Sequence, residues 1–76
     1  MTNAYILTLS CPDRRGLVHA VSGFLLDHDS NIEEAGQFND PATGLFFMRV
    51  RFANAGPAAQ LREDLDAFAK PFEMHW

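Results

Sequence analysis

The chain has 76 residues, of which 47% are hydrophobic and 21% charged, and its formal net charge is −4. This length allows one small domain, expected to span residues 1–76, and excludes a second. The excess of Asp and Glu over Lys and Arg argues against non-specific nucleic-acid binding, which needs clustered Lys and Arg side chains. A single cysteine, Cys11, excludes an internal disulfide and favours a reducing compartment such as the cytoplasm. No apolar stretch approaches the ~20 residues that span a bilayer.

The first half of the chain predicts a strand, a helix and a second strand. Alternating apolar side chains predict a strand over Tyr5–Ser10. Helical spacing then predicts a helix over Gly16–His28, with Asp13 as its N-cap. An extended segment follows over Ile32–Asn39, and residues 40–44 have the composition of a turn. The residues expected on the buried face of the helix are Leu17, Val21, Phe24, Leu25 and His28.

The second half predicts a strand, a helix and a last strand. Residues 45–53 alternate most clearly, with Phe46, Met48, Val50 and Phe52 on one face. Pro57 opens a second amphipathic helix, and Pro71 ends it. The alternation of Phe72–Trp76 predicts a fourth strand, and because the chain stops there without a polar tail we expect a domain cut from a longer protein.

The order β-α-β-β-α-β predicts an α+β fold in which one sheet carries both helices on the same side. Right-handed crossovers around a central hairpin give the ferredoxin-like βαββαβ sandwich, with a four-stranded antiparallel sheet. The open face of this sheet would hold Ile6, Leu45 and Phe47, which is too apolar for a face left in water, so a partner subunit or another domain is expected to cover it. The preferred hairpin register pairs Phe38 with Phe46, Ile32 with Phe52, and Glu33 with Arg51.

The segment Asp13–Val18 joins the first strand to the first helix and is the best candidate for a ligand site. Backbone N–H groups at a helix start, together with the helix dipole, favour an anion. Gly16 permits close approach, and Arg14 or Arg15 adds positive charge. A small carboxylate ligand could dock there, and Asn31 is expected near the same end of the fold.

A purely structural interpretation of the same residues stays open. Asp13 then serves only as a cap, the arginines are solvated, and Asn31 ends the first helix in a left-handed conformation. Both interpretations keep the loop at the surface.

Catalytic and metal chemistry have little support in the sequence. A Cys–His nucleophile would need Cys11 close to His19 or His28, and the sequence shows no group that would orient Cys11 for this role. The three histidines lack the spacing of metal ligands. Glu33 and Glu34 point to opposite faces of a strand, so they are not an acid–base pair. Phe46 and Phe47 with Arg49 and Arg51 faintly resemble the aromatic-plus-basic strand of an RNA-binding sheet, but the K/R-G-F/Y-G/A-F-V-x-F/Y motif is absent and the negative net charge opposes this interpretation. No phosphate-binding loop of the G-x-x-x-x-G-K type occurs. We therefore expect no catalytic and no metal-binding residues in this chain.

Cys11–Val18, Val21–Leu25 and the pair Asn31–Ile32 resemble the start of an ACT domain, whose first-loop motif is D-R-P-G-[LI]-[LV]. Arg15 stands where that motif has proline, which enlarges the loop and adds charge. The stretch S-C-P-D-R-x-G-L-V, together with Phe47–Val50, is similar to the amino-terminal ACT domain of formyltetrahydrofolate deformylases.

The resemblance implies a regulatory domain that binds a small amino acid between two copies of the chain, forming a homo-oligomer. It implies no cofactor in this chain; a carboxy-terminal catalytic domain, beginning after Trp76, would hydrolyse 10-formyltetrahydrofolate to formate and tetrahydrofolate in purine synthesis. A ligand-free dimerisation module and a stand-alone or glycine-cleavage-repressor type of ACT protein remain alternatives. The ligand-binding residues that the resemblance and the loop chemistry indicate are Asp13, Arg14, Arg15, Gly16, Leu17, Val18, Asn31 and Ile32.

Overall fold

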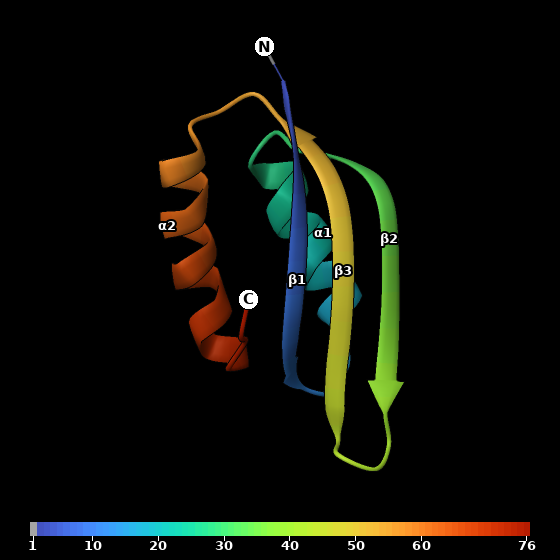
Figure 1. Ribbon diagram of the computed structural model, residues 1–76. Coiled ribbons are helices and arrows are strands. Elements are labelled where there is room, and N and C mark those ends of the chain that lie inside the picture. Colours follow the sequence, from blue (N-terminus) through green and yellow to red (C-terminus); the bar gives the residue numbers. More distant parts are fainter. Residues whose placement is uncertain (1) are drawn as a thin grey trace.

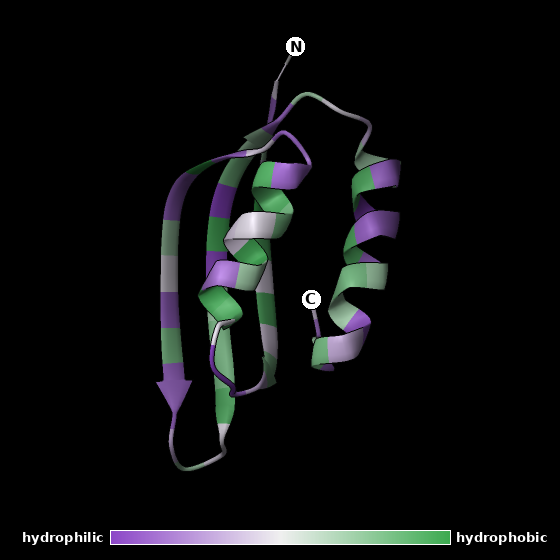
Figure 2. Ribbon diagram, turned by 180° about the vertical axis from the view of Figure 1, so that it is seen from behind, coloured by the Kyte–Doolittle hydropathy of each residue, from purple (hydrophilic) through white to green (hydrophobic). Residues whose placement is uncertain are grey.

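A computed structural model describes residues 2–76, so Met1, the first residue of the expected domain, lies outside it. The three strands form an antiparallel sheet in the order β1-β3-β2, and both helices lie on one face of it (Figures 1 and 2). The predicted α+β ferredoxin-like arrangement is therefore confirmed, with three strands in place of four. The elements are β1 (Asn3–Pro12), α1 (Leu17–Asp27), β2 (Asn31–Asp40), β3 (Leu45–Asn54), α2 (Ala58–Ala69) and a 3-10 turn η1 (Lys70–Phe72).

The fourth strand predicted over residues 72–76 is wrong for the described chain. Pro71 lies inside η1, and Glu73 has a left-handed φ of 55°, so the backbone turns where an extended strand was expected. Beyond that turn the chain forms one isolated antiparallel bridge, between His75 and Ser10 at the outer edge of β1. Alternating apolar residues therefore did not suffice to make a strand after a helix that ends in a proline turn.

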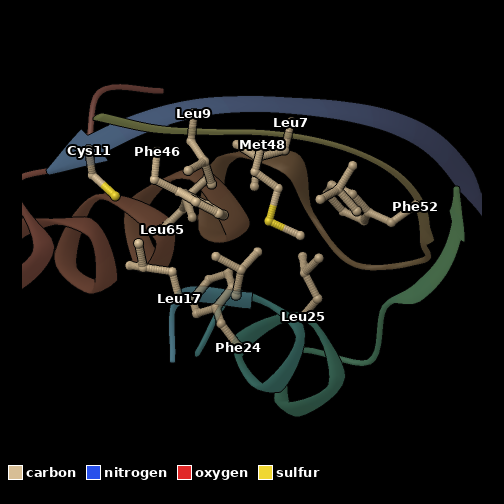
Figure 3. Packing of buried hydrophobic residues seen from close by; sticks show 12 residues of the cluster. Leu7, Leu9, Cys11, Leu17, Phe24, Leu25, Phe46, Met48, Phe52 and Leu65 are labelled. Atoms are coloured by element: carbon tan, nitrogen blue, oxygen red, sulfur yellow. The ribbon is translucent and has the colours of Figure 1, made fainter. Parts of the chain in front are cut away.

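The core lies between the sheet and the two helices (Figure 3). The predicted apolar faces are confirmed for β1, β3 and α1, except that His28 is only half-buried and stacks on Phe24 at 4.1 Å between ring centres. Each fully buried Leu, Val or Phe side chain contributes about 1.5–3 kcal/mol relative to exposure. The buried cluster consists of Leu7, Leu9, Cys11, Leu17, Val21, Phe24, Leu25, Phe46, Met48, Val50, Phe52 and Leu65.

The hairpin register is as predicted at one end and wrong over the rest. Ile32 lies opposite Phe52, but a bulge at Glu33 shifts every later pair by one residue, so that Phe38 lies opposite Phe47 and not Phe46. A bulge adds one residue to one strand, which moves all following side chains to the other face. The bulge thus sends Phe38 to the open face of the sheet.

Two exposed ion pairs accompany the bulge. The Glu33 carboxylate lies 3.4 Å from Nε of Arg51, as predicted, and the Glu34 carboxylate lies 3.7 Å from the guanidinium of Arg49. Both acidic side chains therefore meet an arginine of β3 across the open face. Because all four groups are largely exposed, these pairs add little stability.

Asn54, at the end of β3, is a buried polar residue whose hydrogen bonds hold three segments together. Its Nδ2 donates to the carbonyl of His28 at 2.7 Å and to Oγ of Ser30 at 2.9 Å, and its Oδ1 accepts the N–H of Gly56 at 2.7 Å. The left-handed residue in the turn after α1 is Asp29, with φ 58°, and Asn31 is the first residue of β2. The interpretation of Asn31 as a left-handed helix end is therefore wrong.

Neither α-helix within residues 2–76 combines the length and the apolar character needed to cross a membrane.

Replacing Asn54 by Ala should lower the free energy of unfolding by about 2–3 kcal/mol, because buried backbone groups lose their partners. Urea denaturation followed by circular dichroism measures the loss. Asn39→Ala is the matched control, since Asn39 is exposed and its side chain makes a single hydrogen bond; it should cost below about 1 kcal/mol. Equal losses in the two variants would contradict the role assigned to Asn54.

Candidate functional site

The loop between β1 and α1 ends at Gly16, which is the N-cap of α1 and has a left-handed φ of 87°. Among the described residues no side chain caps this helix, which leaves its first N–H groups without a side-chain acceptor. The predicted N-cap, Asp13, is wrong: it lies three residues earlier, where its N–H donates to the carbonyl of Gly44 at 2.9 Å. Its carboxylate accepts a 2.9 Å hydrogen bond from Nδ2 of Asn39.

A shallow cavity of about 190 Å³ lies beside this helix start. That is about six times the ~30 Å³ share of one water molecule in the liquid. The loop, the first turn of α1 and the last residues of β2 form its walls. Its lining residues are Asp13, Arg14, Gly16, Leu17, Val18, His19, Gln37, Asn39 and Phe46.

Five of the predicted site residues, all within residues 13–18, therefore line one cavity. Leu17 does so from the core, where it is almost fully buried. Arg15 is exposed and lies outside the set of lining residues. The guanidinium of Arg14 lies 5.0 Å from the centre of the Phe72 ring, so it is held against η1 by a cation–π contact.

Asn31 and Ile32 do not belong to this cavity within one protomer. Asn31 pairs with Ala53, whereas Asp40, at the other end of β2, pairs with Leu45 beside the loop. Eight residues of β3 separate the two ends, which corresponds to about 27 Å of strand. The expectation that Asn31 lies near the start of α1 is therefore wrong for a single chain, because β2 runs parallel to β1 and begins where β1 begins.

Gln37 and Asn39 take the place that the sequence prediction gave to Asn31. Both carry side-chain amides, which can donate and accept hydrogen bonds. The predicted register placed them on the open face, and the bulge at Glu33 turns them toward the helices. Their two-residue spacing showed that they share a face, but only the position of the bulge decides which face.

Cys11, directly before the loop, is a buried packing group. Burial raises the pKa of its thiol, the nearby Asp13 carboxylate adds to the rise, and Arg14 opposes it. The thiol is consequently protonated at neutral pH, the form with little nucleophilicity. Within residues 2–76 no three His, Cys, Asp or Glu side chains are grouped to hold a metal ion.

The open face of the sheet carries an apolar patch, which we define as Phe38 and Phe47. Ile6 lies on the same face farther along β1, opposite Arg51. The side chains of Ile6, Phe38 and Phe47 are 58%, 60% and 39% exposed, and the two phenylalanine rings lie 6.2 Å apart. The patch reaches the loop end of the sheet, because Phe47 pairs with Ser10 and is adjacent to Phe46 of the cavity wall. Leu45, also predicted for this face, is half-buried.

The cavity combines the groups that a zwitterion requires. Free N–H groups and the positive end of the α1 dipole favour a carboxylate. The Asp13 carboxylate offers an acceptor to an ammonium group. The side-chain amides of Gln37 and Asn39 can form hydrogen bonds with the carboxylate or with the ammonium group of a zwitterion. These donors and acceptors are of the kind that match a small charged molecule.

The chain is thus a ferredoxin-like sandwich whose first helix starts at a left-handed glycine beside a small cavity. The sequence model of the family described as ACT domain matches residues 5–70, and the chain belongs to this family.

Within the family the chain is similar to formyltetrahydrofolate deformylases. It is 42% identical over 77 residues to the formyltetrahydrofolate deformylase of Corynebacterium sp. strain P-1, a match that covers 95% of this chain and 26% of the relative. The crystal structure of a formyltetrahydrofolate deformylase from Pseudomonas putida KT2440 superimposes with a TM-score of 0.89 at 31% identity, over 96% of this chain and 27% of that one. The chain thus spans about a quarter of the length of these relatives.

A shorter protein has the same fold. The structure of an ACT domain protein from Streptococcus pneumoniae superimposes with a TM-score of 0.81 at 25% identity. That match covers 97% of this chain and 82% of the other, so the fold also occurs in a chain not much longer than this one.

Gly16→Ala should lower the free energy of unfolding by about 1–2 kcal/mol, because only the left-handed backbone resists the added methyl group. A Cβ at Gly16 or at Gly23 meets none of the described heavy atoms within 4 Å beyond its immediate neighbours. Gly23→Ala, inside α1, should therefore raise stability by about 0.5–1 kcal/mol. Chemical denaturation of both variants measures the contrast, and stabilisation by Gly16→Ala would contradict the conformation described for the loop.

Proposed function

We propose that this chain is the regulatory and oligomerising ACT domain of a formyltetrahydrofolate deformylase, and that it senses a small amino acid at an interface between subunits. The parent enzyme would hydrolyse 10-formyltetrahydrofolate to formate and tetrahydrofolate in the cytoplasm, with its catalytic residues in a separate carboxy-terminal domain. Support comes from the family membership and from relatives named for this activity. The chain itself would perform no catalysis.

The observation that carries the sensing part is the cavity beside the free amides of α1. Gly16 keeps side-chain atoms away from the mouth of the cavity, and Asp13 and Asn39 are already held in position by their mutual hydrogen bond. Pre-positioned polar groups lose little conformational freedom when a ligand binds. A small amino acid, with its carboxylate on the helix amides and its ammonium near Asp13, matches these groups.

The observation that supports an interface is the apolar patch of Phe38 and Phe47, with the exposed Ile6 on the same face of the sheet. A second copy related by a two-fold axis would bury this patch on both chains at once. An antiparallel arrangement of the two copies would bring the Asn31 end of one chain beside the loop of the other, so that Asn31 reaches the ligand from across the interface. An effector that binds the paired state better than the separate chains would then shift the population of the paired state.

Adding the effector amino acid at ten times its Kd should raise the melting temperature by roughly 5–10 °C. This follows from a stabilisation of about 1.4 kcal/mol, applied to a domain of this size. Differential scanning fluorimetry with each of the twenty amino acids at millimolar concentration measures the shift. A flat response to all twenty would reject sensing.

A pair of tryptophan variants locates the effector site. Val18→Trp fills the cavity from an exposed position of α1 and should abolish the shift, whereas Leu26→Trp, on the same helix and 73% exposed, should keep it. A shift that persists in Val18→Trp would place the effector elsewhere.

A ligand-free dimerisation module is the second candidate. It is favoured by the fact that Arg14 already packs on Phe72 and that the Asp13 carboxylate already accepts a hydrogen bond. If this candidate is right, amino acids do not change the melting temperature, and the chains still associate with one another. A stand-alone or glycine-cleavage-repressor type of ACT protein is the third candidate, with the short Streptococcus pneumoniae protein as a structural precedent. Reading the coding sequence after residue 76 distinguishes this candidate from the other two.

Phe38→Asp should weaken self-association at least tenfold, because it places a charge in the centre of the proposed interface. Leu26→Asp is the matched control, since Leu26 is a more exposed apolar residue on the far side of the molecule. Sedimentation velocity over a concentration series measures both variants. If Phe38→Asp and Leu26→Asp associate equally well, the copies do not meet through the sheet face.

A further inference from the structure

The open face of the sheet, which is turned away from both helices (Figure 1), is hollowed beside the apolar patch. The hollow has a volume of about 440 Å³, and the residues around it include Phe38 and Phe47 of the patch and, in the next row of the sheet, Gly36 and Arg49. This volume is about fifteen times the ~30 Å³ share of one water molecule in the liquid, which is ample for an aromatic ring.

The hollow exists because β2 has a glycine at position 36. Gly36 lies opposite Arg49 and two residues before Phe38, so all three positions belong to the open face. A Cβ at Gly36 would meet none of the described heavy atoms within 4 Å beyond its immediate neighbours, and its φ is not left-handed. Packing and backbone conformation within one chain therefore do not require a glycine here, although glycine weakens a strand. In a strand interior such a glycine is typical of a position that another molecule approaches closely.

We propose that Gly36 and Phe38 set the register in which two copies of this chain meet, with the Phe38 ring of each copy seated over the partner's Gly36. The proposal rests on the pairing of sheet faces proposed above and goes beyond it by naming the residues that align the two faces. It requires a two-fold axis that crosses the strands at the level of Met48, midway between Phe47 and Arg49 of β3. Under this axis the row that contains Phe38 in one copy lies over the row that contains Gly36 in the partner.

A second copy fits this face because the face is complementary to itself. The same axis places the Phe47 ring of one copy over the partner's Arg49, and a guanidinium over an aromatic face is attractive. Both side chains come from one strand at alternate positions, so each copy gives and receives one such contact. The two arginines of the face each lie within 3.7 Å of a glutamate carboxylate of the same chain, so these charges cancel and two copies meet without net repulsion.

The axis also agrees with the position of the candidate site. Asn31 pairs with Ala53, which is five residues after Met48. The axis exchanges this level of the sheet with the level five residues before Met48, which is the turn between β2 and β3. Asn31 of one copy therefore lies over the partner's hairpin turn, to which the loop of the candidate site is bonded through the N–H of Asp13.

Gly36→Phe tests the register and leaves the core untouched. The new ring fills the hollow and collides with the partner's Phe38, so self-association should weaken at least about tenfold. The free energy of unfolding of the separate chain should not fall, because the added side chain enters open space and aromatic residues favour strands. Phe38→Ala, which removes the seated ring, should also weaken self-association at least about tenfold. Leu26→Phe, which places the same ring on the far side of the molecule, should associate like the unchanged chain.

An equimolar mixture of the two weakened variants is the decisive measurement. The Gly36→Phe chain carries a ring at both positions and the Phe38→Ala chain carries a ring at neither, so a mixed pair sets every ring opposite a gap. The mixture should therefore form one-to-one pairs as tightly as the unchanged chain pairs with itself, although neither variant associates well alone. Sedimentation velocity over a concentration series measures the variants and the mixture, and urea denaturation of dilute samples measures the stability of each chain.

Self-association of Gly36→Phe at the strength of the unchanged chain would overturn the proposal, and so would a mixture that stays monomeric. In both cases a loss of association in Phe38→Asp would still support pairing through the sheet face, so failure of the register is distinguishable from failure of the proposed function. An unchanged chain that does not associate at all would reject both.

Discussion

The packing of β3 against α1 is the constraint on which the rest of the structure depends. β3 is the central strand, and its helix-facing residues Phe46, Met48, Val50 and Phe52 are all buried. In a domain of this size, which buries only about 60% of the surface of its unfolded chain, one such row is a large share of the available core. Because β3 pairs with both neighbours, its orientation also decides which face each neighbour presents.

The fold was predictable where apolar periodicity is unbroken. Alternation in β1 and β3 and the helical spacing in α1 placed the strands, the helix and nearly all of the core correctly, because burial of an apolar row has one physical solution. His28 was the exception, since its ring stacks on Phe24 while Nε2 lies 3.4 Å from the carboxylate of the half-buried Asp64. The last strand failed because local backbone chemistry at Pro71 and Glu73 outweighed the apolar alternation that follows.

The loop residues of the candidate site could be predicted from the sequence, whereas the β2 residues that line the cavity, Gln37 and Asn39, could not. Asp13 to Val18 carry their chemistry in contiguous sequence, so the free amides and the permissive Gly16 could be inferred directly. Gln37 and Asn39 depend on the bulge at Glu33, and β2 has too few apolar residues to fix its own register. In a weakly specified strand the register depends on contacts across the hairpin, such as the ring pair of Phe38 and Phe47, which the periodicity of a single sequence does not weigh.

The cavity and the end of the described chain are joined by two contacts. Arg14, in the loop, packs on Phe72, and Ser10, at the end of β1, bonds to His75. A displacement of the Arg14 guanidinium away from the Phe72 ring would therefore remove one of the contacts that hold η1. The Arg14 side chain is exposed, so this contact with the half-buried Phe72 ring is worth only about 0.5–1 kcal/mol. Such a coupling needs no deformation of the core, because both contacts lie outside the buried row of β3.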